Sequence, residues 1–158
     1  MTPAVKSLER AKVAFKLHEY EHDPAADSFG QETAEKLGVD PQRIFKTLVA
    51  ATDAGKLVMA IVPVSGRLNL RALAKELSVR RAEMADPARA EGATGYVVGG
   101  ISPLGGRKAM PVLIDRSVMD HATIFISAGR RGMQIEIAPA DLVRLIKASL
   151  AYIAAPAE

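Results

Sequence analysis

A single lysine, Lys46, stands in the middle of an otherwise apolar segment at residues 44–49. The segment is rich in residues that favour β-strands, so its side chains should point alternately to two apolar faces. A lysine at such a position either extends its ammonium group to the edge of the sheet or lines a pocket. The sequence leaves both interpretations open, and the second would put a cation where a substrate could bind.

Glycine residues gather around a second candidate site at residues 95–106. Gly99 and Gly100 directly follow a short apolar run, and glycine there allows the backbone to approach a ligand closely. Backbone amides freed in this way can bind an anion or a developing oxyanion. The alternative is a tight loop that needs only positive φ angles. The spacing matches neither a phosphate-binding P-loop nor a dinucleotide fingerprint.

Arginine and lysine residues form two further groups. Arg67, Arg71 and Lys75 recur every four residues and share one face of an expected helix. Arg130 and Arg131 lie at the tip of an expected hairpin. Such groups supply phosphate contacts in nucleic-acid-binding proteins. For each residue taken alone, an ordinary charge on a solvated surface is the alternative.

The sequence contains no obvious attacking group or metal site. It has no cysteine, which excludes disulfides, thiolate ligands and a cysteine nucleophile. No nucleophile-elbow motif is present. His18 and His22 flank Tyr20, but two histidines four residues apart on a strand or loop do not converge on a metal as they would on a helix. We therefore expect no metal cofactor.

A mixture of strands and helices must position these residues. Capping residues and apolar residues at helical spacing predict helices at residues 3–15, 29–37, 70–77 and 139–149. Short runs rich in β-branched residues predict strands at residues 17–20, 44–51, 57–64, 96–98, 112–115, 123–128 and 134–137. Turns at residues 52–56 and 129–132 would make two hairpins. This order predicts a single α+β domain over residues 1–158, with a mixed, strongly curved sheet flanked by helices.

Length and composition agree with one globular domain and narrow the range of partners. The 158 residues are 49% hydrophobic and 25% charged, which is not typical of a disordered chain. The N-terminal residues lack the apolar run of a signal peptide, and the longest apolar run, residues 57–64, is too short to span a membrane. We therefore expect a cytoplasmic protein with no membrane partner. The net charge of +3 permits an anionic partner.

Several segments, in their order and spacing, resemble one family along nearly the whole chain. They are TPAV at residues 2–5, YEHDP at 20–24, FG at 29–30, FKTL at 45–48, MADP at 84–87, GYVVGGISPLG at 95–105 and SAGRRG at 127–132. The chain resembles the YbaK-type Cys-tRNA deacylases. The resemblance implies a barrel-like mixed sheet related to the editing domain of bacterial prolyl-tRNA synthetases. It implies release of cysteine from mischarged Cys-tRNA(Pro), and less selectively from Cys-tRNA(Cys), with no metal or organic cofactor and no DNA partner.

The resemblance also implies roles for individual residues, with Lys46, Gly99 and Gly100 as the catalytic set. Lys46 would contact the terminal adenosine of the tRNA or its phosphate. The carbonyl oxygen and the 3′ ribose would be received by the backbone amides of a Gly-x-x-x-Pro loop made of Gly99, Gly100, Ile101, Ser102 and Pro103. The amino-acid pocket would be lined by Tyr20, Phe29 and Thr47 on one side and by Ser127, Gly129 and Glu136 on the other. The tRNA acceptor end would be held by Arg130, Arg131, Arg67 and Arg71.

In this family the attacking group is expected to come from the substrate. The thiol of an attached cysteine can attack the ester carbonyl and give a thiolactone and free tRNA, so the protein need supply only positioning and oxyanion stabilisation. The family is linked to prolyl-tRNA synthetase, whose pocket cannot fully exclude cysteine because the two amino acids are similar in volume. A complex with prolyl-tRNA synthetase is therefore a further expected partnership.

Two alternatives stay open. The same fold could release alanine from Ala-tRNA(Pro), and a protein-bound water would then have to attack because alanine has no thiol. The chain could instead be a non-catalytic module that holds an RNA end. The absence of tryptophan and an aromatic content of 4% argue against single-strand binding by stacking.

Overall fold

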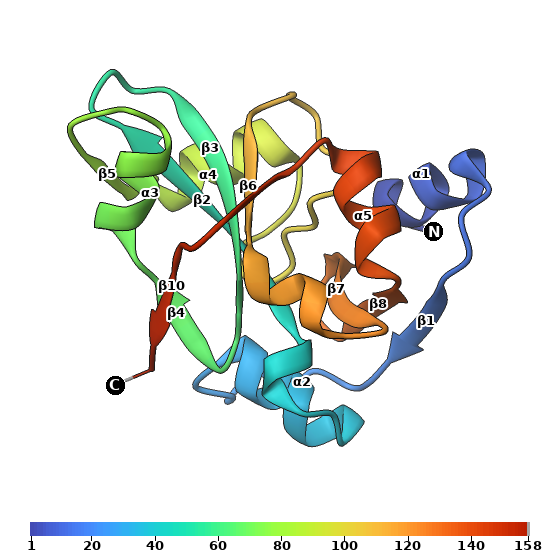
Figure 1. Cartoon of the computed structure of the whole chain (residues 1–158). Helices are drawn as coiled ribbons and strands as arrows, with labels where there is room; N and C mark the ends of the chain where they lie inside the picture. The colour runs from blue at the N-terminus through green and yellow to red at the C-terminus, as the bar shows by residue number, and fades with distance from the viewer. Residues whose placement is uncertain (158) are drawn as a thin grey trace.

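The helices begin and end where local chemistry dictates. The computed structural model describes residues 1–157 (Figure 1). Its α-helices are α1 (Pro3–Ala11), α2 (Phe29–Leu37), α3 (Leu70–Glu76), α4 (Pro87–Thr94) and α5 (Pro139–Ile146), and its 3-10 helices are η1 (Pro41–Arg43) and η2 (Arg116–Asp120). The expected caps are confirmed, because Thr2, Ser28 and Asn69 each accept a hydrogen bond from a backbone amide of the first turn.

Two predicted helices are shorter than expected. The first was predicted to reach Phe15, but Lys12 adopts the left-handed conformation and ends α1 at Ala11. The last was predicted to include Ser149, but Lys147 ends α5 in the same way, and Ser149 begins a strand. In both cases apolar residues continue at helical spacing beyond the end of the helix, although the backbone has already left the helical conformation.

The strands form three sheets. They are β1 (Lys16–Glu19), β2 (Phe45–Thr52), β3 (Leu57–Pro63), β4 (Gly66–Leu68), β5 (Ala82–Met84), β6 (Val112–Asp115), β7 (Ile124–Arg130), β8 (Met133–Ile137), β9 (Ser149–Ala151) and β10 (Ala154–Pro156). The sheets have the orders β5-β2-β3-β6-β9, β1-β8-β7 and β10-β4. Both predicted hairpins, β2–β3 and β7–β8, are antiparallel, whereas β3–β6 and β6–β9 are parallel. The predicted α+β class with a mixed sheet and flanking helices is confirmed, although the sheets do not close into one barrel.

The strand predicted at residues 96–98 is wrong. These residues belong to an irregular connection between α4 and β6, in which the buried Tyr96 hydroxyl donates a hydrogen bond to the Leu104 carbonyl at 2.6 Å. An apolar run of three residues between glycines was read as a strand, but its first side chain anchors a loop. Helix α4 and the three-residue strands β4, β5, β9 and β10 were also not predicted from the sequence.

The five-stranded sheet is covered on both faces. Ile61 and Ile114 belong to one apolar cluster, with residues of α1, α4, α5, β7 and β8, whereas Val62 and Leu113 belong to a second cluster with residues of α3. Figure 1 shows the C-terminal segment after α5 crossing in front of the sheet to reach β10 beside β4. Burial on both faces explains why β2 and β3 read as continuous apolar runs rather than as alternating ones.

Strand β2 is flanked by β5 along only part of its length. The two strands pair from Ala50 to Thr52, and the last bond of this edge runs from the Ala85 amide to the Val49 carbonyl at 3.0 Å. At the other end of β2, a parallel bridge joins Ile44 to Phe125 of β7. Between these two points β5 leaves an edge of β2 uncovered, and the candidate site lies along it.

Candidate active site

A cavity of about 660 Å³ opens along this edge of β2. The first turn of α2 bounds it at one end and the start of α4, with the residues just before it, at the other. The glycine-rich segment and the strands β7 and β8 supply the remaining wall. This volume lies in the range of pockets that bind whole small molecules.

The cavity brings together residues that lie far apart along the chain. Six of the residues predicted from the sequence line it, namely Phe29, Lys46, Thr47, Gly99, Ile101 and Ser127. Their convergence from positions up to about a hundred residues apart is a property of the fold. The cavity is therefore the location of the site that the sequence predicted.

Lys46 lies in the cavity rather than at an open surface. Its side chain is half-buried and lines the cavity, and within residues 1–157 its ammonium group has no hydrogen-bond or ion-pair partner. Burial lowers the pKa of this lysine, because desolvation disfavours its charged form. Of the two interpretations that the sequence left open, the structure favours a pocket lysine.

Two buried polar atoms in the cavity wall have no hydrogen-bond partner within residues 1–157. They are Oγ1 of Thr47 and Oε1 of Gln134, and the two residues are only 8% and 7% exposed. A buried polar group left unpaired costs about 1–3 kcal/mol. Both residues line the cavity, so a ligand that donates hydrogen bonds there would remove this cost. Gln134 was not among the residues predicted from the sequence.

Glu136, which was predicted to line the pocket, lies outside the cavity wall and is fully engaged elsewhere. Its carboxylate accepts hydrogen bonds from the Thr123 hydroxyl at 2.5 Å and from Nη2 of Arg43 at 3.4 Å, and it pairs with Nε2 of His18 at 2.9 Å. The hydrogen bond from Thr123, supported by His18, holds the pKa of Glu136 below its usual value. This cluster fastens β1 and η1 to β8.

The peptide unit that precedes Gly99 is held from both sides. The Val98 amide donates to Oε2 of Glu91 on α4 at 2.8 Å. The Val98 carbonyl accepts from Nη2 and Nε of Arg131 at 2.6 and 3.1 Å. One residue further on, the Gly100 carbonyl accepts from the Ser127 hydroxyl at 2.9 Å. The glycine segment therefore has a fixed course.

Both glycines are required by close contacts. Gly99 has φ +89°, and a Cβ atom there would lie 2.6 Å from the Phe29 ring. A Cβ atom on Gly100 would lie 2.8 Å from the backbone of Arg130. The tight-loop interpretation is thus satisfied, and for Gly99 it is compatible with a ligand role because this residue also lines the cavity. Gly100, predicted with it, does not line the cavity, and its amide donates to the Val97 carbonyl at 2.9 Å. Ser102 and Pro103 are buried and do not line it.

The α2 wall of the cavity is fixed by a series of side-chain contacts. The Tyr20 hydroxyl bonds to the Thr33 hydroxyl at 2.6 Å, and Thr33, unlike Tyr20, lines the cavity. Burial raises the pKa of Tyr20. Glu32 accepts from the Asp23 amide at 2.6 Å and pairs with Nδ1 of His22 at 2.7 Å. Burial alone would raise the pKa of Glu32, but these bonds outweigh it and lower the pKa.

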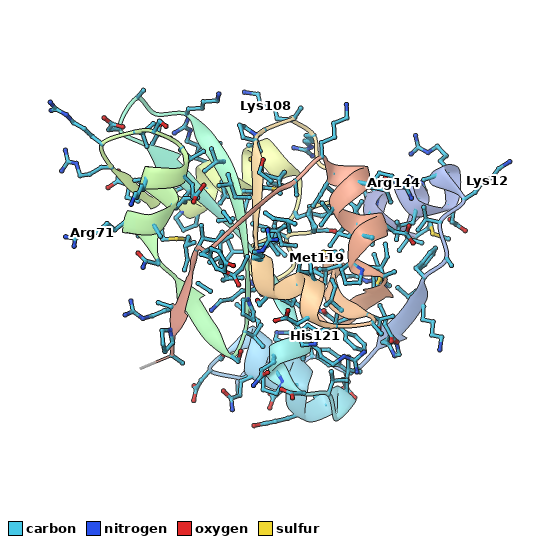
Figure 2. All side chains as sticks on the ribbon, in the orientation of Figure 1. Lys12, Arg71, Lys108, Met119, His121 and Arg144 are labelled. Carbon is cyan, nitrogen blue, oxygen red and sulfur yellow. The ribbon has the colours of Figure 1, made fainter. Side chains whose placement is uncertain are left out.

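The four arginines predicted to bind tRNA occupy different environments. Arg131 stacks on Phe29, with its guanidinium carbon 4.5 Å from the ring centroid, so it supports a residue of the cavity wall from outside the lining. Arg130 is exposed on the same hairpin. Arg71 on α3 points away from the body of the protein (Figure 2), and Arg67 on β4 donates to the Pro156 carbonyl at 3.3 Å. None of these four arginines is among the described residues that line the cavity.

The remaining expectations concern Gly129, metals and membranes. The Gly129 amide donates to the Ser127 hydroxyl at 3.1 Å, and the residue itself packs against Tyr96 rather than against the cavity.

Within residues 1–157, no three histidine or acidic side chains lie together in a way that could hold a metal ion. None of the helices in that range has the length and apolar character to cross a membrane.

Comparison with known proteins assigns the class of this molecule. The family model of the aminoacyl-tRNA editing domain matches residues 22–145. The chain therefore belongs to the aminoacyl-tRNA editing domain family. The predicted enzyme class, an aminoacyl-tRNA deacylase, is confirmed by this match together with the relatives that follow.

Individual relatives narrow the comparison. The EbsC protein of Enterococcus faecalis, named as a candidate Cys-tRNA(Pro)/Cys-tRNA(Cys) deacylase, is 38% identical over 153 residues, which cover 96% of this chain and 92% of that protein. A proline–tRNA ligase of Acidithiobacillus ferrooxidans is 33% identical over 97 residues, or 61% of this chain and 17% of the ligase. A crystal structure of a candidate trans-editing enzyme for prolyl-tRNA synthetase has a TM-score of 0.84 at 22% identity, covering 98% of this chain and 99% of that one, which supports the fold. The predicted membership of the YbaK/EbsC-type family is confirmed.

Proposed function

We propose that this enzyme is a trans-editing deacylase that releases cysteine from mischarged Cys-tRNA(Pro), and less selectively from Cys-tRNA(Cys). The observation that carries this proposal is the similarity to EbsC, which extends over nearly the full length of both chains. Editing of this kind is needed because a synthetase pocket distinguishes amino acids of similar volume by only about 1–3 kcal/mol. Translation takes place in the cytoplasm, which therefore remains the expected location.

The lining of the cavity offers no activated protein nucleophile. The Ser127 hydroxyl donates to the Gly100 carbonyl and accepts from the Gly129 amide, so it is committed to holding the glycine segment. The Thr47 hydroxyl has no base beside it within hydrogen-bond distance in residues 1–157. Among the described residues, no histidine lines the cavity. A serine or threonine nucleophile needs such a base for activation.

The substrate thiol supplies the attacking group in our proposal. Its sulfur forms a bond to the ester carbonyl carbon, and the bond from that carbon to the 3′ oxygen of the tRNA breaks. The thiol proton passes to the leaving oxygen, so the products are a cysteine thiolactone and tRNA with a free 3′ hydroxyl. Holding the thiol against the ester within one molecule contributes about 7 kcal/mol or more through effective molarity.

Five groups have roles in this proposal, four of them in the cavity lining and one, Arg130, outside it. Oγ1 of Thr47 and Oε1 of Gln134 accept hydrogen bonds from the α-ammonium group of the attached cysteine, which satisfies both buried atoms. The Gly99 backbone amide stabilises the oxyanion that develops on the carbonyl, since the Gly100 amide already donates to the Val97 carbonyl at 2.9 Å. The Lys46 ammonium contacts the terminal nucleotide or its phosphate. The exposed Arg130 offers a charge to the adjoining phosphates.

Single-turnover deacylation of tRNA(Pro) charged with cysteine, serine or alanine tests the proposal. Serine and alanine lack the thiol, so their release should be slower by several orders of magnitude even where binding is comparable. Mass analysis of the early product should detect the thiolactone. Equal rates for alanine and cysteine would contradict the thiol mechanism and support attack by water on Ala-tRNA(Pro). No release of any amino acid, with RNA still bound, would support the non-catalytic binding module.

The expected complex with prolyl-tRNA synthetase is a separate part of the proposal. Its support is the similarity of 61% of this chain to a segment of a proline–tRNA ligase, because a ligase with an editing segment joins the two activities in one chain. Co-sedimentation of this protein with the synthetase, with and without tRNA(Pro), tests whether the two activities associate in trans. Sedimentation of each protein alone under both conditions would contradict the complex.

A further inference from the structure

We propose that the outer part of the cavity is a nucleobase subsite that binds the terminal adenine of the tRNA, with Met84, Pro87 and Val98 as its apolar wall and Asp86 as its hydrogen-bond acceptor. The inference rests on the proposed function, because it assumes that the cavity receives the aminoacylated end of a tRNA. It assigns a role to the segment at residues 84–87, which the chemistry at the other end of the cavity does not use.

The size of the cavity exceeds what an amino acid requires. A cysteinyl group has only a handful of heavy atoms, whereas a cavity of about 660 Å³ suits a ligand of drug-like size. The unpartnered Thr47 and Gln134 mark the end where the aminoacyl group would lie. The nucleoside that carries this group must then fill the remainder of the cavity.

The rim near α4 is unusually apolar for an exposed surface. Met84 and Val98 are 48% and 37% exposed, and both line the cavity together with Pro87. The three residues share one stretch of rim, because the Val98 amide bonds to Glu91, one helical turn after Pro87 on α4. A flat, largely apolar base would cover these side chains and gain affinity from their removal from water.

Asp86 stands at the edge of this apolar rim with its carboxylate unoccupied. It takes the N-cap position of α4, but its side chain makes no capping hydrogen bond, and it has no ion-pair or hydrogen-bond partner in the described residues. It also lines the cavity. A carboxylate there can accept a hydrogen bond from the exocyclic amino group of adenine and would repel a phosphate or a keto oxygen.

The charges around the mouth also set the direction of the RNA. Asp27 and Asp86 are exposed on the α2 and α4 sides of the cavity. Arg130 is exposed on the β7–β8 hairpin, the third side. The sugar–phosphate backbone should therefore leave the cavity over the hairpin, while the base turns toward α4.

Binding of uncharged acceptor-stem RNA tests the base recognition independently of deacylation. The probes are tRNA(Pro) acceptor stems that end in adenosine or in inosine, whose keto oxygen replaces the amino group. The unaltered protein should bind the adenosine end about tenfold more tightly, a difference of one charged hydrogen bond. The Asp86→Asn variant should bind the two ends about equally, because an amide can donate to the keto oxygen or accept from the amino group. Equal affinities in the unaltered protein, or an unchanged ratio in Asp86→Asn, would overturn the inference.

The apolar wall is tested with a matched pair of methionines. Met84→Ser should weaken binding of the adenosine-ended stem severalfold, whereas Met119→Ser should leave it unchanged. Met119 on η2, labelled in Figure 2, is 46% exposed, close to the 48% of Met84. It is not among the residues that line the cavity. Equal effects of the two changes would contradict the subsite. Deacylation of Cys-tRNA(Pro) by the unaltered protein is measured in parallel, so that failure of the proposed function is distinguished from failure of the base subsite.

Discussion

Two polar residues on β8, only two positions apart, have opposite surroundings. Gln134 and Glu136 point to the same face of the strand, because side chains alternate along it. Glu136 is surrounded by Thr123, His18 and Arg43, and its carboxylate has a partner on both oxygens. Gln134 is more deeply buried, yet its carbonyl oxygen has no partner among the residues that the structure describes.

The difference separates polar groups that hold the fold from those that await a ligand. A buried acceptor with partners stabilises the native state, because its hydrogen bonds within the protein compensate for the loss of hydration. A buried acceptor without partners lowers stability and is retained where something outside the protein completes it. Lys46 belongs with Gln134 in this respect, since it too lines the cavity without a partner in residues 1–157. The following changes test that division.

The largest effect is expected from Lys46→Ala. Loss of the only lysine that lines the cavity should slow deacylation of Cys-tRNA(Pro) by about a hundredfold or more, as removal of a preorganised charge or donor does in other active sites. The melting temperature should stay the same or rise, because burial of this lysine without a partner opposes folding. Lys46→Arg should keep part of the activity if the charge serves the end of the tRNA. Unchanged single-turnover rates for Lys46→Ala would remove this residue from the site.

A paired change on β8 tests the central comparison directly. Gln134→Leu should reduce deacylation by about tenfold and leave stability equal or higher, because it removes an unsatisfied buried atom. Glu136→Gln should lower the free energy of unfolding by about 1 kcal/mol or more and keep most of the activity, because it weakens a satisfied cluster. Urea unfolding gives the free energy of unfolding of each variant, and single-turnover kinetics give its rate of deacylation. The opposite pattern would show that Glu136 serves the chemistry.

Substitution of the two neighbouring arginines of the hairpin should have smaller effects, and the effects of the two should differ in kind. Arg131→Gln removes the bonds to the Val98 carbonyl and the stacking on Phe29, so we expect kcat to fall severalfold. Arg130→Gln should leave kcat unchanged and reduce the salt dependence of tRNA binding by about one unit of log-log slope. Titrations of tRNA(Pro) binding at several salt concentrations distinguish the two. A loss of slope in Arg131→Gln alone would mean that Arg131, not Arg130, contacts phosphate.

The smallest effect concerns acid stability. Because the hydrogen bond from Thr123 lowers the pKa of Glu136 in the folded protein, the ionised form stabilises the fold. This stabilisation is complete above the usual glutamate value of 4.5 and is lost as the pH falls through the lower value of the folded state. The difference in melting temperature between the unaltered protein and Glu136→Gln should therefore shrink in acid. A difference that is constant from neutral pH into acid would contradict the assignment.

Local signals predicted the larger elements, and tertiary contacts decided the rest. Thr2, Ser28 and Asn69 capped helices as their residue types suggested, and the apolar runs around residues 52–56 formed the predicted hairpin. The run at residues 96–98 carried a strand signal, but the hydrogen bond of Tyr96 to the Leu104 carbonyl holds it in a loop. Short strands such as β5 have too few residues to show a period.

The sequence predicted the chemistry of the candidate site better than it predicted which residues form it. Lys46, Thr47 and Ser127 were predicted from a lone cation and from the family resemblance, and all three line the cavity. Gln134 was missed, because nothing along β8 distinguishes it from Glu136. The partners that occupy Glu136 come from β1, η1 and the residue before β7, and sequence spacing does not reveal such contacts. Asp86 was noticed only as part of a motif, since an N-cap aspartate without its capping bond looks ordinary in sequence.

The shortness of β5 bears on self-association. A sheet edge with unpaired backbone groups is a template onto which another chain can add a strand, and proteins commonly protect such edges with lysine or by recessing them. Here the stretch of β2 that β5 leaves uncovered lies inside the cavity, and Lys46 stands in the middle of it. The residue that we assign to the tRNA end would thus also deter edge-to-edge aggregation. Evolution of this enzyme toward another substrate would then be constrained by solubility as well as by catalysis, because an apolar replacement of Lys46 would leave an apolar strand edge without its charge.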